Sequence, residues 1–320
     1  MRTKRFSVCV AFLGAGLVVA TAAGLAPAAE KEARVEVLDE AFKQVADERA
    51  EVRQLATDFK FTEGPTWYAA GKCLLFSDIP ANRIYQWTEQ GGKKVWREPS
   101  HQANGNTTDN QGRLVTCEHA SRRVTRTGKD GQVQVLCDRY QGKRLNSPND
   151  VAVKRDGTIW FTDPPYGLRG KKAELDGCYV FQLDPGKAEP VIVARDFTRP
   201  NGIAFSPDEA YLYVANSDRD APHVRRFRVK ADNTLEGGDV FCKISPGGPD
   251  GIRVDADGRL YVSAGDGVQV FSREGNLIGK IRTPQGAANC CFGGTDGRTF
   301  FITARKSLWA VPLKGSGARR

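Results

Sequence analysis

Several residue patterns that mark common catalytic centres are missing from this sequence. Only three histidines occur, and they form no HxH or HExxH pattern, which disfavours a histidine-rich zinc centre. No GxSxG motif occurs, which disfavours a serine nucleophile. The eight cysteines form no pair of CxxC motifs. Their spacing predicts no connectivity for the one or two disulfides that an oxidising compartment would allow.

Long apolar runs are also scarce, and the single long one lies at the N-terminus. The basic stretch MRTKR precedes FSVCVAFLGAGLVVATAAGLA, and APA at residues 26–28 has the small residues of a cleavage site. This pattern predicts a signal peptide over residues 1–28, with an uncleaved membrane anchor as the alternative. We therefore expect an exported protein, periplasmic or secreted, with no other membrane segment.

Positive charge is concentrated at the two ends of the chain. The formal net charge of +9 falls to about +3 without the three basic residues of the signal and the three of the tail. SRRVTRTGK and VRRFRVK alternate as strands with solvated outer faces, and neither forms a basic stripe with interleaved aromatic residues. The charge pattern therefore disfavours a nucleic-acid partner and leaves a small molecule as the expected partner.

A short unit repeats six times along the chain. Three copies are RPNGIAFSPDEAYLYVAN (199–216), SPNDVAVKRDGTIWFTD (147–163) and GPDGIRVDADGRLYVSAGD (248–266). The others are TEGPTWYAAGKCLLFSD (62–78), ANGNTTDNQGRLVTCEH (103–119) and AANCCFGGTDGRTFFIT (287–303). Each copy has a polar residue, a short alternating strand, a turn and a stronger strand. Eight positions before each turn residue stands an acid or a carboxamide: Glu63, Asn104, Asn149, Asn201, Asp250 and Asn289.

Repeats spaced about 40–50 residues apart, with several strands in each, predict a β-propeller. Strand pairs such as RIYQWTEQGGKKVWRE (83–98) complete about four strands per unit. We therefore predict an all-β fold, a six-bladed β-propeller over residues 52–313, with a sandwich of hairpins as the alternative. Apolar residues at helical spacing predict a short N-terminal helix within residues 29–51, and KGSGARR (314–320) predicts a disordered tail.

The six polar residues of the repeat are expected to form a ring around the central channel. Carboxylates of Glu63 and Asp250, with carboxamide oxygens of Asn149 and Asn201, would make an all-oxygen cage. Such ligands suit Ca²⁺ best, with Mg²⁺, Mn²⁺ or Zn²⁺ as further candidates. The alternatives are Asx-turns that only cap the strands, or a calcium ion with a purely structural role.

Four motifs of the repeat resemble the gluconolactonase/SMP-30/regucalcin-like family. They are TEGPTW (62–67), SPNDVAV (147–153), RPNGIAFSPDEAYLYVAN (199–216) and GGPDGIRVD (247–255), and the resemblance runs from about residue 52 to about residue 312. RLVTCEHASRRVTR and FTDPPYGL resemble the bacterial gluconolactonase branch. The resemblance implies a six-bladed propeller with a divalent metal, commonly Ca²⁺, in its channel. The family's metal-binding positions correspond to Glu63, Asn149, Asn201 and Asp250.

This resemblance implies hydrolysis of a sugar lactone such as gluconolactone. The metal would polarise the lactone carbonyl, and Asp250 would be the general base for the attacking water. Asn104 and Asn149 would orient the substrate, and Glu118 and His119 are further candidate substrate contacts. Phosphotriester or phosphofluoridate hydrolysis on the same cage is one alternative. A non-catalytic ligand-binding propeller is another.

One position departs from the family pattern. Some lactonases of the family carry an arginine as a substrate contact two residues before the asparagine of the N-D motif. Here Ser147 occupies that place. Arg144 and Arg169 are candidates to replace the arginine, so the sequence leaves the preferred sugar acid open.

Overall fold

The computed structural model describes Met1 and residues 32–318. The chain divides into two units, Met1–Glu30 and Lys31–Arg320, and all described strands belong to the second. The predicted signal peptide and its cleavage site lie outside the described residues. Within the described residues, no helix is long and apolar enough to cross a membrane.

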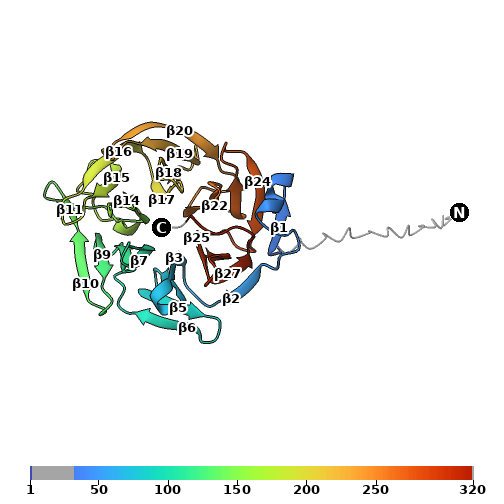
Figure 1. Cartoon of the computed structure of the whole chain (residues 1–320). Coiled ribbons are helices and arrows are strands. Elements are labelled where there is room, and N and C mark those ends of the chain that lie inside the picture. The colour runs from blue at the N-terminus through green and yellow to red at the C-terminus, as the bar shows by residue number, and fades with distance from the viewer. Residues whose placement is uncertain (2–31, 319–320) are drawn as a thin grey trace. The chain divides into compact units, whose positions relative to one another are not determined.

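Residues 32–318 form a β-propeller of six antiparallel blades, which confirms the predicted fold class (Figure 1). In every blade the first strand in the chain is innermost, because consecutive strands pair outward as hairpins. The blades consist of β3–β6 (Thr62–Tyr68, Cys73–Asp78, Arg83–Thr88, Gly92–Arg97), β7–β10 (Ala103–Thr108, Leu114–Glu118, Arg123–Thr127, Val133–Cys137), β13–β16 (Val151–Val153, Ile159–Asp163, Cys178–Leu183, Val191–Phe197), β17–β20 (Pro200–Phe205, Tyr211–Asn216, His223–Val229, Leu235–Lys243), β21–β24 (Ile252–Val254, Leu260–Ala264, Gly267–Phe271, Leu277–Arg282) and β25–β27 (Asn289–Gly293, Thr299–Ala304, Ser307–Pro312). A small hairpin, β11–β12 (Arg139–Tyr140, Lys143–Arg144), and two 3₁₀ turns, η2 (Ala69–Gly71) and η3 (Tyr166–Leu168), lie in the connections.

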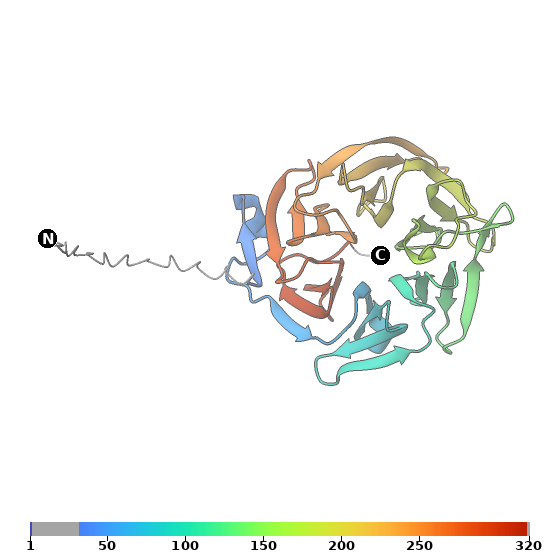
Figure 2. The same ribbon diagram turned by 180° about the vertical axis from the view of Figure 1, so that it is seen from behind.

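The ring is closed by a strand from the other end of the chain. β2 (Arg53–Ala56) pairs antiparallel with β27, so the last blade takes its outermost strand from the N-terminal side. Each innermost strand contacts the innermost strand of the next blade, and β25 contacts β3. Figure 2 shows the same closed ring from behind, with short inner strands around the axis. Because the ring is closed, the first residues of the innermost strands face one another across the channel.

The segment before the propeller differs from the predicted helix. Arg34–Val37 forms a strand, β1, that pairs with β24, and only Glu40–Gln44 is helical, as the 3₁₀ turn η1. The alternation in RVEV suits a strand, and β1 covers the otherwise unpaired edge of a blade. Phe42, which the helical spacing had included, is buried against Gly279 of β24.

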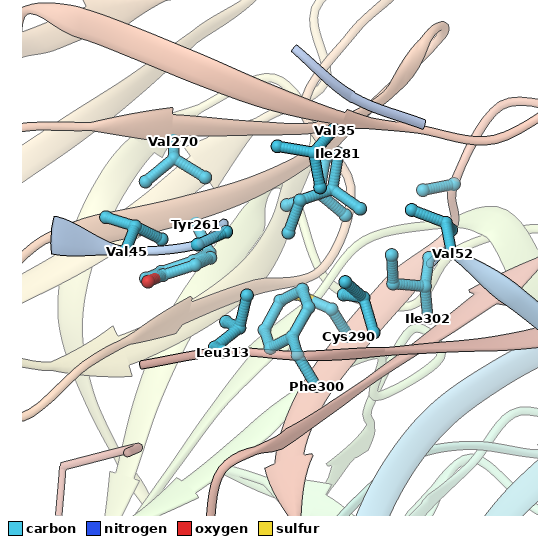
Figure 3. Close-up of a cluster of buried hydrophobic side chains, with 14 of the residues drawn as sticks. Val35, Val45, Val52, Tyr261, Val270, Ile281, Cys290, Phe300, Ile302 and Leu313 are labelled. Carbon is cyan, nitrogen blue, oxygen red and sulfur yellow. The ribbon is translucent and has the colours of Figure 1, made fainter. Parts of the chain in front are cut away.

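The N-terminal segment completes the hydrophobic core between the last two blades. Figure 3 shows Val35, Val45 and Val52 beside side chains of both blades. The labelled partners are Tyr261, Val270, Ile281, Cys290, Phe300, Ile302 and Leu313. This packing makes residues 35–52 part of the folded unit, although they precede the first blade.

The tail is ordered as far as the structure describes it, in contrast to the predicted disorder of residues 314–320. Lys314 N donates to Val45 O at 2.8 Å, and Ala256 N donates to Ser316 O at 2.9 Å. Ala318 N donates to Val254 O at 3.2 Å. Backbone hydrogen bonds therefore hold residues 314–318 on the N-terminal segment and the fifth blade, while residues 319–320 lie outside the described part.

The cysteines act as small core residues. In the described part of the chain all seven are free, and six of them are buried. Burial raises the pKa of the Cys290 and Cys242 thiols to about 12. These thiols are therefore protonated and unreactive at neutral pH.

Candidate active site

Five of the six repeated polar residues line one cavity at the axis of the propeller. The cavity has a volume of about 390 Å³ and contains Glu63, Asn104, Asn149, Asn201 and Asp250 in its wall. These residues lie at or just before the starts of innermost strands, so the closed ring brings five different blades together there. The structure thus unites all four predicted metal ligands and the predicted substrate contact Asn104.

A glycine follows most of these polar residues because the inner strands approach very closely there. A methyl group on Gly64 would overlap the backbone of Asn104, and one on Gly202 would overlap the backbone of Asp250. Gly202 N donates to Asp250 O at 3.2 Å. The pairing register also shifts just after Glu63 and Asn201, as in β-bulges. The repeated polar-glycine pair thus aims a side chain at the axis while the next strand passes beside it.

We expect Gly202→Ala to destabilise the fold by about 1–3 kcal/mol or more, because the new methyl group meets backbone atoms that cannot move aside. Urea unfolding would measure the loss. Gly315→Ala is the matched control, since its methyl group meets no atom within 4 Å. An equal stability change in the two variants would contradict this account of the inner strands.

Glu63 is held rigidly at the cavity wall. Its Oε2 accepts hydrogen bonds from Gly64 N at 2.9 Å and from Asn289 Nδ2 at 3.1 Å. Asn289, the sixth repeated polar residue, therefore orients Glu63 instead of lining the cavity. Burial raises the pKa of Glu63 well above its usual range, and the charge of Asp250 adds to the effect. A cation in the cavity would oppose both causes.

Asp250 and Asn201 stand on neighbouring blades. Asn201 Nδ2 donates to Ser217 Oγ at 3.0 Å, which leaves its amide oxygen as the acceptor available to a ligand. Ser217 Oγ in turn donates to the carbonyl of Pro249, next to Asp250. Removal from bulk water raises the pKa of Asp250. Two carboxyl groups with raised pKa values facing one cavity are typical of a functional site.

Asn104 and His119 form a hydrogen-bonded pair in the cavity wall. Asn104 Nδ2 lies 3.1 Å from His119 Nε2, and both residues are buried. Burial lowers the pKa of His119 to about 4, and the charge of Arg169 acts in the same direction. The imidazole is therefore neutral at pH 7 and accepts from the amide. Asn104 Oδ1 is buried without a hydrogen-bond partner, which leaves an acceptor for a ligand.

We expect His119 to make the fold less stable as the pH falls from about 6.5 to 4, because only the unfolded chain gains a proton there. The loss between pH 7 and pH 4.5 is about 2–3 kcal/mol by this linkage. Urea unfolding at the two pH values, in the wild type and in His119→Gln, would measure it. An unchanged pH dependence in the variant would show that the ring is not buried in its neutral form.

Glu118 does not reach the cavity, so its predicted substrate contact is not formed. Arg97 Nη2 lies 3.1 Å and Arg123 Nε 2.6 Å from its carboxylate oxygens. Ser121 and Thr125 also donate to this carboxylate. Glu118 is fully buried with all of these partners. It therefore forms structural ion pairs with the two arginines at the end of β8.

Tyr166, Arg199, Ser217 and Arg219 also line the cavity, and sequence reasoning missed them. Tyr166 belongs to η3, which follows β14. Ser147 helps to fix this turn, because its Oγ donates to Pro164 O at 2.6 Å and accepts from Gly167 N at 2.8 Å. The serine that replaces the family's arginine thus supports a turn that brings Tyr166 to the cavity. Arg144 donates to Ser121 O and is not among the lining residues.

An ion pair lies in the channel beside the cage. Arg253 Nη1 of β21 is 3.4 Å from Asp150 Oδ2, and both side chains are largely buried. Arg253 also lines a second cavity of about 280 Å³, whose wall includes residues from the opposite ends of the inner strands and from the tail. The ion pair therefore connects the residue that follows Asn149 of the cage with the wall of this second cavity.

The residues of the cage fit a hard divalent cation. Two carboxylates and two carboxamides converge on one cavity, and Asn104 adds a buried unpaired oxygen. Hard cations such as Ca²⁺ prefer such oxygen ligands. No group of three or more His, Cys, Asp or Glu side chains within residues 32–318 has metal-binding geometry, so a soft-metal centre has no ligand set there.

Comparisons with known proteins agree with this fold. The chain is 34% identical to a gluconolactonase of Zymomonas mobilis over 304 residues, covering 85% of this chain and 84% of the relative. A solved gluconolactonase of Xanthomonas campestris is 39% identical, with a TM-score of 0.83, covering 88% of this chain and 95% of that one.

More distant structures share the propeller. A calcium-binding regucalcin of Agrobacterium tumefaciens has a TM-score of 0.70 at 20% identity, covering 85% of this chain and 98% of that one, which shows the common fold. Residues 61–306 match the family described as SMP-30/Gluconolactonase/LRE-like region, and they hold all six polar residues of the repeat. The chain therefore belongs to the SMP-30/gluconolactonase/LRE-like family.

Proposed function

We propose that this protein hydrolyses a sugar lactone at the axial cavity, with a divalent cation, preferably Ca²⁺, held in the cage. The observation that carries the proposal is the convergence of Glu63, Asn149, Asn201 and Asp250 on one cavity. Membership of a family with gluconolactonases among its members supports lactone hydrolysis as the reaction.

Glu63, Asn149, Asn201 and Asp250 are the residues that would hold the cation. When bound, it would supply Lewis acidity for the lactone carbonyl and stabilise the negative charge that develops on the carbonyl oxygen. Glu63 contributes charge and a fixed position, because Gly64 and Asn289 hold its carboxylate. Asn201 contributes a neutral oxygen, oriented by Ser217.

Asp250 is the proposed general base. It is half-buried at the cavity wall, so a water molecule in the cavity is within reach of its carboxylate. Removal of a proton from this water would produce the nucleophile that attacks the lactone carbon. The ring ester C–O bond would then break, and the proton held by Asp250 would pass to the departing ring oxygen. His119 is neutral at pH 7 and holds Asn104, so this pair suits orientation of the substrate hydroxyls better than proton transfer.

The experiment that tests the proposal is a panel of substrates with the purified protein. Glucono-δ-lactone and γ-lactones of sugar acids would be compared with a phosphotriester and a phosphofluoridate, and each rate corrected for spontaneous hydrolysis. We expect saturable hydrolysis of at least one sugar lactone. Hydrolysis of the phosphorus esters alone would instead establish the alternative chemistry, and binding of a lactone without turnover would establish a ligand-binding propeller.

We also propose that the chain is exported, periplasmic or secreted, with residues 1–28 removed as a signal peptide. The support is the basic start, the apolar run and the APA sequence at residues 26–28. Mass spectrometry of the native protein should find an N-terminus close to Glu30. A protein that retains Met1 in the cytoplasm would contradict the proposal.

A further inference from the structure

Two arginines line the axial cavity without an acidic partner. Arg199 and Arg219 are part of the cavity wall. Neither side chain is within ion-pair distance of a carboxylate in residues 32–318. Arg199 is half-buried, whereas most half-buried arginines of the blades, such as Arg97 and Arg253, have such a partner. Arg219 is exposed. A guanidinium group beside a ligand cavity, with its donors unused, is a ready site for an anion.

Both arginines stand at the same end of one strand pair. Arg199 directly precedes β17 and Arg219 follows β18, and these antiparallel strands pair Pro200 with Asn216 at this end. The backbone there is fixed, because Arg199 N donates to Asn216 Oδ1 at 3.0 Å and Ser217 N donates to Arg199 O at 3.0 Å. The fourth blade therefore presents Arg199 from a fixed backbone, and Arg219 from the bend that follows β18.

Tyr166 limits the movement of Arg199. The guanidinium carbon lies 5.9 Å from the centre of the Tyr166 ring, a cation–π arrangement. Tyr166 itself lines the cavity and sits on the turn that Ser147 holds. This contact involves the face of the Tyr166 ring and is not a hydrogen bond, so it does not use the N–H groups of Arg199 as donors.

Further positive charge surrounds the same cavity. The guanidinium carbon of Arg305 lies 5.7 Å from the centre of the Phe61 ring, which lines the cavity. The positive charge of Arg305 favours the ionised form of Asp250. Arg169 follows the 3₁₀ turn that holds Tyr166, and its positive charge favours the neutral form of His119. Neither has a carboxylate partner within residues 32–318. The nearby Asp218 accepts from Thr198 and from Asp220 N. The cage carboxylates are committed to the cation in the proposed function.

We infer that Arg199 and Arg219 bind an anionic substituent of the substrate, remote from the lactone carbonyl. The substrate class is then a sugar lactone that carries a phosphate, sulfonate or second carboxylate group. This inference rests on the proposed function for the identity of the reacting group. The carbonyl lies at the cage, and the anionic substituent lies against the fourth blade, so the two interactions fix the orientation of the sugar.

The test compares kcat/KM for three lactones: glucono-δ-lactone, its 6-phosphate and a lactone of glucaric acid. They provide no charge, a phosphate and a carboxylate at the remote end. We expect the wild type to prefer an anionic lactone by about tenfold or more, the scale of a charge-assisted hydrogen bond. Arg199→Gln and Arg219→Gln should each reduce this preference by about tenfold, mainly through KM. Salt should raise KM for the anionic lactone more than for the neutral one.

Arg298→Gln is the matched control, because Arg298 is exposed in the turn at the other end of the sixth blade and has no carboxylate partner in the described residues. The control should keep the wild-type preference. Equal kcat/KM for neutral and anionic lactones in the wild type would overturn the inference and leave the proposed function intact.

Binding separates this inference from failure of the proposed function. If no lactone is hydrolysed, calorimetry with gluconate 6-phosphate and gluconate still decides the question. Tighter binding of the phosphate by the wild type, lost in Arg199→Gln and Arg219→Gln, would support the anion site. Equal binding of the two ligands would overturn it.

Discussion

Replacement of Asp250 by Asn is expected to lower kcat for lactone hydrolysis by about 10²–10⁴-fold with the divalent cation still bound. General-base assistance has this magnitude. Asparagine keeps a ligand oxygen of similar size and position, but it cannot accept a proton from water at neutral pH. Saturating cation should therefore not restore turnover.

The measurement is kcat at saturating cation, with the bound metal counted by elemental analysis. Asp257→Asn is the control, because Asp257 is exposed in a turn and pairs with Arg259 away from the axial cavity. Near-normal kcat in Asp250→Asn with metal bound would show that another group removes the proton. Glu118 is a poor replacement, since Arg97 and Arg123 already hold its carboxylate.

Glu63→Gln is expected to act on metal affinity rather than on proton transfer. The substitution removes one of the two charges of the cage, so the affinity for Ca²⁺ should fall by at least the 10–100-fold that is typical even for changes next to metal ligands. Excess cation should restore part of the rate, because Asp250 is still present.

Asn289→Ala is expected to have a smaller effect on cation affinity. Asn289 Nδ2 donates to Glu63 Oε2 but does not line the cavity, so its removal should weaken cation binding less than Glu63→Gln does. Chelator competition would rank the wild type and the two variants. An affinity for Ca²⁺ in Glu63→Gln equal to that of the wild type would place the cation elsewhere.

The repeated polar residues could be predicted from the sequence because the fold repeats them. A register of eight residues before each turn, from Glu63 to Asn289, requires only that every blade begins in the same way. The inner strand pairs follow that register, and closure of the ring therefore brings the repeated positions together at the axis. The different role of Asn289 was not visible, because it depends on a contact between the sixth and first blades.

The rest of the cavity wall lies in segments without periodicity. Tyr166 is in the 3₁₀ turn η3 between β14 and β15, and Arg199 and Arg219 flank β17 and β18 outside the polar positions that the repeat marks. The only available signals were the departure at Ser147 and the basic residues around the RPNG motif. The burial of Glu118 depends on Arg97 of the preceding blade, a pairing between segments that no local pattern contains.

The ends of the chain show how tertiary contacts override local patterns. Val35 and Val37 alternate, but the apolar spacing through Phe42 and Val45 resembled a helix. The open edge of β24 selects the strand, because pairing satisfies backbone groups that a helix would leave exposed on that edge. Residues 314–318 are glycine-rich, and backbone hydrogen bonds to the N-terminal segment and the fifth blade still order them.

The central claim is that a divalent cation in the cage of Glu63, Asn149, Asn201 and Asp250 is needed for sugar-lactone hydrolysis. The most direct test is the hydrolysis rate of the preferred lactone before chelation, after complete removal of metal, and after addition of Ca²⁺, Mg²⁺, Mn²⁺ or Zn²⁺. The account predicts that activity disappears with the metal and returns with at least one of these cations, in proportion to one bound ion per chain. Full activity in protein that elemental analysis shows to be free of metal would contradict it.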